Sequence, residues 1–229
     1  MPEWLVRLAG RERDLRFLAT ALRDPWRITE EASKFYLGSS RFEGLGDAGE
    51  VKRLADEFVD WADLHALLRF EGYQGVQTAE IVGLDPNGSS RATVTIFAAA
   101  FASGRATVFG SATIIGSQPT PPPDLTRDTS LLRQRPRLAK AVKYVREEPG
   151  WYGYWKATEA FGEEIGGLDE IVSRGWATQD QYDRFYKTVH HHRHHRVPAP
   201  ANPMREDEVR SLLLGWLRRC LDWRLSERR

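Results

Sequence analysis

Five of the six histidines lie in one short segment, residues 190–195, together with a single arginine. If this segment is helical, His190 and His194 stand one turn apart, as do His191 and His195, and two imidazoles at this spacing can reach one metal ion. A zinc, nickel or copper site is one interpretation. The other is a partly exposed basic tract whose protonated imidazoles are favoured at a helix C-terminus. Because a zinc site normally takes three or four ligands, and the nearest other candidates are arginines, we expect no metal cofactor.

The same region holds a second pattern, in which Arg184 and His190 stand six residues apart and Arg193-His194 follows. Together with the helices around it, this half of the chain resembles the HEPN family of helical domains (higher eukaryotes and prokaryotes nucleotide-binding). The resemblance covers roughly the last 85 residues and includes an NPM turn. It lies in the segments WYGYWKATEAFGEEIGG, GWAT, DRFYKTVHHHRHHRVP and EDEVRSLLLGWLRRCLDW.

The resemblance implies a helical bundle that often dimerises, with arginine and histidine from each protomer meeting at the interface. In the ribonuclease members of the family this pair works without metal. The arginine holds a phosphate and stabilises charge at phosphorus, while the histidine moves the proton of the attacking 2′-hydroxyl. Carried over to this sequence, the expected catalytic residues are Arg184, His190, Arg193 and His194.

Two departures from the family pattern weaken the expectation of catalysis. Phe185 stands where a polar residue usually follows the arginine. Arg193-His194 provides the usual arginine-polar start, but Pro198 and Pro200 occupy the region where its partner histidine would fall. Members of such families that have lost activity serve as binding or assembly modules.

The helical half is rich in tryptophan, with two competing interpretations. Stacking on unpaired bases would suit RNA binding. Burial in the core or a dimer interface is favoured instead, because Trp216 repeats with Leu212, Leu213 and Cys220 at helical spacing, and Trp155 with Phe161. The tryptophans concerned are Trp151, Trp155, Trp176, Trp216 and Trp223.

The composition is that of an ordinary folded chain. Of the 229 residues, 41% are hydrophobic and 28% are charged, which excludes a disordered tail and a collagen-like fibre. The net charge is +1, but residues 1–120 carry −3 and the remainder +4, so phosphate binding is permitted in the second half without being demanded. One cysteine, Cys220, suits a reducing cytoplasm. No apolar run is long enough for a membrane span, and we expect a cytoplasmic protein with no membrane contact.

Prolines divide the chain into two parts. Pro119, Pro121, Pro122 and Pro123 favour an extended linker, which we place at residues 118–130. The expected domains are an α+β sheet domain over 1–117 and a HEPN-like helical bundle over 131–229. The fold class is therefore α+β, a small antiparallel-sheet domain followed by an all-α bundle.

Apolar periodicity places the elements of each domain. Before the linker, strands are expected around residues 4–8, 26–29, 34–39, 76–84, 91–102 and 106–115, with helices over 15–22 and 48–70. After it, helices are expected over 138–147, 151–165, 168–174, 179–192 and 205–226.

The sheet domain offers no arrangement of residues for catalysis. The glycine-rich segment 44–49 precedes a helix but lacks the lysine and hydroxyl of a phosphate-binding loop, so Asp47 is expected to cap the helix. The small apolar segment 97–101 could line a ligand groove, although a packed strand is favoured. A surface of the sheet that binds a protein partner is the expectation for this domain.

Three functions remain open from the sequence. The first is an RNA-directed module of a stress or phage-defence system, with metal-independent phosphodiester chemistry or RNA binding. The second is a non-enzymatic adaptor that dimerises through its bundle and binds a partner or small ligand through its sheet. The third is a metal-responsive protein that uses the histidine pairs. In the first two, a homodimer is expected.

Overall fold

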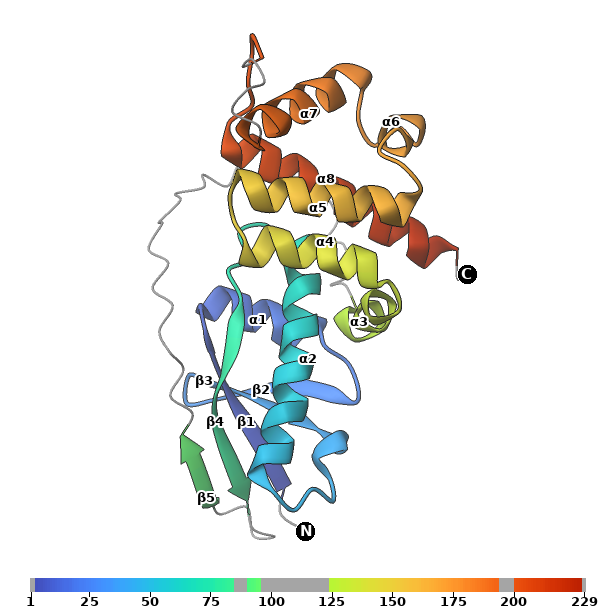
Figure 1. Ribbon diagram of the computed structural model, residues 1–229. Coiled ribbons are helices and arrows are strands. Elements are labelled where there is room, and N and C mark those ends of the chain that lie inside the picture. Colours follow the sequence, from blue (N-terminus) through green and yellow to red (C-terminus); the bar gives the residue numbers. More distant parts are fainter. Residues whose placement is uncertain (1–2, 85–89, 96–123, 194–199, 228–229) are drawn as a thin grey trace, which may run out of the picture. The chain divides into compact units, whose positions relative to one another are not determined.

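A computed structural model describes residues 3–84, 90–95, 124–193 and 200–227 (Figure 1). The chain divides into two compact units, Met1–Thr129 and Ser130–Arg229, called here the sheet unit and the helical unit. In the part of the chain that the structure describes, no helix has both the length and the apolar character needed to cross a membrane.

The sheet unit is built on five strands in the order β2-β3-β1-β4-β5, and every neighbouring pair is antiparallel. Val6 at the centre of the sheet pairs with Leu37 on one side and with Ile81 on the other, and all three side chains are buried. Ala32 and Ser33 join two of the strands with positive φ angles, as a two-residue hairpin turn requires. The strands are β1 (Glu3–Gly10), β2 (Trp26–Glu31), β3 (Lys34–Ser39), β4 (Val76–Leu84) and β5 (Ser90–Thr95).

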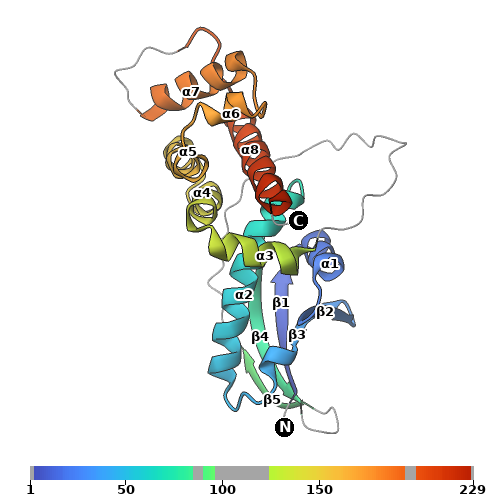
Figure 2. The same ribbon diagram turned by 90° about the vertical axis from the view of Figure 1, so that its right-hand side faces the viewer.

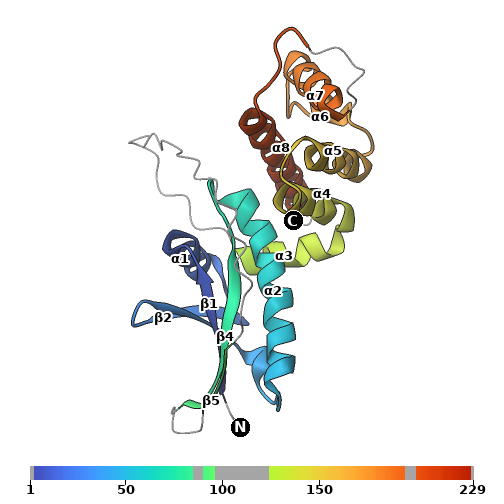
Figure 3. The ribbon, with the colours of Figure 1, turned by 60° about the vertical axis from the view of Figure 1, so that its left-hand side comes forward.

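Two helices pack on this sheet, α1 (Glu12–Ala21) and α2 (Ala48–Arg69), and a 3-10 turn, η1 (Ser40–Phe42), follows β3. Asp47 caps α2, as expected, by accepting hydrogen bonds from the Gly49 and Glu50 amides at 3.1 and 3.3 Å. Helix α2 lies along one face of the sheet (Figure 3), where it packs against β4 and its Phe58 ring stacks on Trp26 at 3.9 Å.

The expected strands and helices before residue 96 are confirmed within a few residues at each end, as is the α+β class. Strand β5 corresponds to the start of the strand expected over 91–102. The remainder of that strand, the segment 97–101 and the strand expected over 106–115 lie outside the described residues.

The helical unit contains α4 (Pro136–Glu147), α5 (Trp151–Ile165), α6 (Glu170–Ser173), α7 (Gln179–Arg193) and α8 (Glu206–Ser226). Helix α5 is central: it packs on α4, α7 and α8 (Figures 1 and 2). The largest fully buried side chains of the unit come from three helices, so one core joins them: Tyr154 and Phe161 of α5, Phe185 of α7, and Trp216 of α8.

The connection between the units differs from the expected linker. Residues 118–123 lie outside the described residues, but residues 125–130, which the sequence assigned to the linker, form the first part of α3 (Leu125–Gln134). Leu125, Thr129, Leu131 and Leu132 are all buried, and this apolar face stabilises a helix immediately after the prolines. The division between the two units falls within α3.

A tight turn joins α4 to α5 and depends on one glycine. A Cβ atom on Gly153 would lie 1.7 Å from the carbonyl oxygen of Glu148, closer than any contact that a real structure tolerates. The missing side chain therefore lets the first turn of α5 approach the last turn of α4. Gly166 ends α5 with a φ of +93°, in the left-handed conformation that glycine adopts most readily.

Candidate nucleic-acid interface

Arg184, the first of the expected catalytic residues, holds the segment that leads into α8. Its Nε donates a hydrogen bond to the Asn202 carbonyl (3.0 Å), and its Nη2 donates to the Pro203 carbonyl (3.4 Å). The same Nη2 lies 3.5 Å from Glu208 Oε2. These contacts assign the guanidinium of Arg184 to packing of α7 on the start of α8.

His190 projects in a different direction, toward α5. Six residues on an α-helix turn through about 600°, so the side chains of Arg184 and His190 point about 120° apart. The His190 ring meets the Trp155 ring edge to face, with centroids 5.3 Å apart, and it stacks on Tyr186 at 5.6 Å. Within one chain, the structure does not bring Arg184 and His190 together.

Arg193 lies on the same side of α7 as His190 and contacts the same tryptophan. Its guanidinium lies 4.3 Å from the centroid of the Trp155 ring, and its Nη1 lies 3.1 Å from Glu159 Oε1 on α5. His194, the last of the expected catalytic residues, lies outside the described residues. As a catalytic set, these four residues remain a prediction.

The end of α7 and the beginning of α5 form a second stack beside the first. The His192 ring lies parallel to the Trp151 ring, with centroids 3.9 Å apart and an interplanar angle of 7°. His192 is exposed and Trp151 is half-buried. We call the two stacks together the stacking face, which consists of Trp151, Trp155, Tyr186, His190, His192 and Arg193.

The expectation that the tryptophans lie in the core or a dimer interface is confirmed for two of them, which lie in the core. Trp216 is 1% exposed and Trp155 is 8% exposed, so both belong to the interior. Trp151, Trp176 and Trp223 are only half-buried. The Trp223 ring lies between the guanidiniums of Arg174 and Arg224, each 3.9 Å from its centroid.

Charge at the stacking face comes from the last turn of α7. That turn contains His190, His191, His192 and Arg193, at the helix end where the dipole favours cations. With its histidines counted as neutral, α7 contains three basic residues and two acidic residues. The face thus combines flat rings with positive charge, which is the chemistry that binds unpaired bases and their phosphates.

The other chemistry expected for the histidine tract is metal binding. Among the described residues, no three histidine, cysteine, aspartate or glutamate side chains are grouped so that they could hold a metal ion. The i, i+4 partners in the two histidine pairs, His194 and His195, lie outside those residues.

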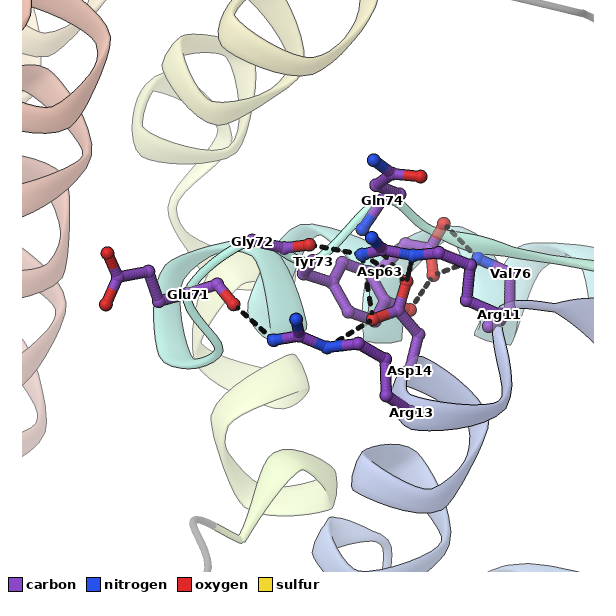
Figure 4. A network of polar contacts seen from close by, with 9 residues as sticks. All are labelled: Arg11, Arg13, Asp14, Asp63, Glu71, Gly72, Tyr73, Gln74 and Val76. Carbon is purple, nitrogen blue, oxygen red and sulfur yellow. Dashed lines mark hydrogen bonds and ion pairs between the residues drawn. The ribbon is translucent and has the colours of Figure 1, made fainter. Parts of the chain in front are cut away.

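The sheet unit holds a buried polar network that the sequence did not predict (Figure 4). The fully buried carboxylate of Asp14 accepts hydrogen bonds from Arg11 Nε at 3.1 Å and from the Gln74 amide at 3.0 Å. Arg11 also donates to the Gly72 carbonyl, and Arg13 donates to the Glu71 carbonyl at 2.8 Å. These bonds attach the start of α1 to the loop that precedes β4.

Asp63 on α2 holds the other end of the same loop. Its carboxylate accepts hydrogen bonds from the Val76 amide at 3.2 Å and from the Tyr73 hydroxyl. A groove of about 200 Å³ beside it is lined by Asp56, Val59, Asp60, Asp63, Val76, Gln77 and Thr78. Because the Asp63 carboxylate serves the loop and the start of β4, we assign it to folding.

The sequence holds one indication of the role of Asp63, which is the single carboxylate in the apolar run ADLHALL. A carboxylate buried in such a run needs hydrogen-bond donors, but the sequence does not show which residues supply them. For the stacking face the signal was the pairing of Trp151 and Trp155 with the histidine tract. The sequence could not show that they meet.

Comparison of the chain with protein families, with curated proteins and with solved structures finds no match.

Proposed function

We propose that the helical unit binds single-stranded RNA on the stacking face. The observation that carries this proposal is the parallel stack of His192 on Trp151 at 3.9 Å, next to Arg193 over Trp155 at 4.3 Å. A base that stacks on the exposed His192 ring would extend a stack that the protein has already begun. Arg193 would meet the phosphates of the same strand.

RNA is preferred to other polyanions because of the resemblance of this half to the HEPN domains. We propose that one chain binds RNA without cleaving it, because its Arg184 and His190 have different partners. Arg184 contacts Asn202, Pro203 and Glu208, whereas His190 contacts Trp155. We place this activity in the cytoplasm, where the buried thiol of Cys220 would stay reduced.

Fluorescence anisotropy with a labelled, unstructured RNA oligonucleotide tests the proposal. Trp151→Ala removes the ring that supports His192 and should weaken binding about tenfold, because loss of one base-stacking contact costs about 1–3 kcal/mol, whereas Trp151→Phe keeps a ring beneath His192 and should retain most of the affinity. Arg193→Gln should reduce the slope of log affinity against log salt by about 0.7, the loss of one phosphate contact. Lys34→Gln, an equal charge change at an exposed residue of the sheet unit, is the control.

Two results would reject the proposal. One is the absence of salt-dependent binding in the parent protein. The other is equal affinity of the parent and Trp151→Ala. Addition of an Arg184→Ala variant also tests the predicted catalytic pair. If the parent cleaves the RNA in the presence of EDTA and Arg184→Ala does not, the activity is that of a metal-independent ribonuclease.

A further inference from the structure

Beside the stacking face, lysines and tyrosines of α4 and α5 alternate along one surface. Lys156 Nζ lies 4.5 Å from the centroid of the Tyr152 ring and 5.0 Å from that of Tyr144. Lys140 Nζ lies 5.7 Å from the centroid of the same Tyr144 ring. We call these four residues, in the spatial order Tyr152, Lys156, Tyr144 and Lys140, the lysine–tyrosine ladder.

Helical spacing and the tight turn between the helices build the ladder. Lys140 and Tyr144 stand one turn apart on α4, and Tyr152 and Lys156 stand one turn apart on α5, so each pair lies on one side of its helix. The two helices pack side by side (Figures 1 and 2). Because Gly153 allows the close approach described above, the two pairs come into contact with each other.

Charge along this part of the chain suits a polyanion. Residues 136–156 contain five basic and two acidic residues, a net charge of +3. The rest of α5, residues 157–165, contains three acidic residues and no basic one, so the positive charge gathers at the first half of α5 and on α4. A hydrogen bond to Glu148 raises the pKa of Lys156, which therefore stays charged.

The ladder is continuous with the stacking face through the first turn of α5. Trp151 belongs to the stacking face and contacts α7, while the next residue, Tyr152, contacts Lys156, which in turn contacts Tyr144 of α4. Tyr152 is 60% exposed, the most exposed large hydrophobic side chain among the described residues. One strand of nucleic acid could therefore touch both surfaces without leaving α5.

We infer that the lysine–tyrosine ladder extends the RNA-binding surface, so that a single strand crosses α5 from α7 to α4. This inference rests on the proposed function of the stacking face. Tyr152 stacks on an unpaired base, and Lys156 and Lys140 contact the phosphates that follow. A duplex is excluded as the ligand, because its bases are already stacked and paired and cannot lie on Tyr152.

Glu148 provides a test whose sign distinguishes binding from packing. Its carboxylate lies 2.8 Å from Lys156 Nζ, so it competes with any phosphate for that ammonium group. Glu148→Gln should therefore tighten RNA binding about threefold or more. If the ladder served only to pack α4 on α5, loss of this ion pair would leave RNA affinity unchanged or lower it.

The experiment measures the affinity of the full-length protein for oligouridines of increasing length, for a duplex of equal length, and at several salt concentrations. Tyr152→Ala should weaken binding about tenfold, whereas Tyr152→Phe keeps the ring and should bind like the parent. Lys156→Gln and Lys140→Gln should each lower the salt slope by about 0.7. Lys34→Gln again serves as the charge control.

The outcomes separate this inference from the proposed function. Normal binding by the ladder variants, with binding lost in Trp151→Ala, would overturn the ladder and leave the stacking face as the site. Equal affinity of the parent for duplex and single strand would also overturn it. Absence of RNA binding by the parent would overturn both. Circular dichroism of each variant shows whether a loss of affinity reflects a loss of folding.

Discussion

Asp14 in the sheet unit and Arg193 in the helical unit are charged side chains that bind groups elsewhere in their own unit, yet they differ in exposure. The Asp14 carboxylate is fully buried, and it accepts hydrogen bonds from Arg11 and Gln74. Arg193 is 31% exposed and lies between Glu159 and the Trp155 ring at the surface. Both are well positioned, but only the second can meet a ligand without unfolding of its surroundings.

This difference shows how to separate polar residues that maintain a fold from those that bind. A buried carboxylate with several donors is costly to disturb and offers nothing to solvent. A half-exposed cation over an aromatic ring contributes only about 0.5–1 kcal/mol to stability, and the proposed RNA binding uses the part of it that solvent reaches. The comparison predicts large stability effects with unchanged binding for the first class, and the reverse for the second.

The largest expected effect comes from a comparison of a buried tryptophan with a half-buried one. Trp216→Ala should lower the free energy of unfolding by about 3–5 kcal/mol, because Trp216 is 1% exposed in the core of the helical unit. Trp151→Ala should cost less than about 1.5 kcal/mol while it weakens RNA binding. Urea denaturation followed by circular dichroism measures both. Equal losses of stability would break the comparison.

The next largest effect lies in the sheet unit. Asp14→Ala should lower the free energy of unfolding by about 3 kcal/mol, because it leaves the Gln74 amide and Arg11 without their carboxylate. RNA affinity should not change in the fraction that stays folded. A loss of affinity by this folded fraction would show that the sheet unit takes part in binding.

Arg184→Ala should have a smaller effect, a loss of about 1 kcal/mol, because its three contacts are partly exposed to solvent. Arg184→Lys keeps the charge but cannot reproduce contacts to two carbonyls and a carboxylate, and we expect it to lose nearly as much. Thermal unfolding of the two variants provides the measurement. Unchanged stability of both variants would contradict the packing role of Arg184 and leave the catalytic role as the remaining prediction.

The smallest expected effect is that of the Cys220 thiol on the free energy of unfolding, which changes only at alkaline pH. Burial raises the pKa of the Cys220 thiol to about 12, above the ordinary value of 9.0. Between these pH values the folded protein holds a proton that the unfolded chain has lost, so the stability contributed by this thiol decreases as the pH rises from about 9 to about 12. Cys220→Ala should flatten this part of the stability profile. Rapid reaction of native Cys220 with a thiol reagent at pH 8 would contradict its burial.

Regular elements with strong periodicity could be predicted from the sequence. The prediction for α5 matches the observed helix at both ends, and that for α7 ends one residue early. Helix α3 was not predicted, because four nearby prolines outweighed the apolar pattern of Leu125, Leu131 and Leu132. Its stability comes from burial, which a local pattern of prolines does not report.

Site residues were harder to predict than helices. Sequence spacing identified Arg184 and His190 as a pair, although six residues on a helix already imply side chains about 120° apart. The contacts of Asp14 with Gln74, and of Trp151 with His192, join residues 60 and 41 positions apart. No single sequence reveals such pairs, since they exist only after the helices have packed.

Because Gly153 brings α5 close to α4, the number of residues between the two helices fixes which side chains of α5 point toward α4 and α7. Each residue of an α-helix turns the next side chain by about 100°. Insertion or deletion of a single residue near Pro149 would therefore turn Lys156 away from Tyr144 and Trp151 away from His192 at once. Homologous chains that conserve both surfaces should keep the glycines and the number of residues in this turn, while its other residues vary.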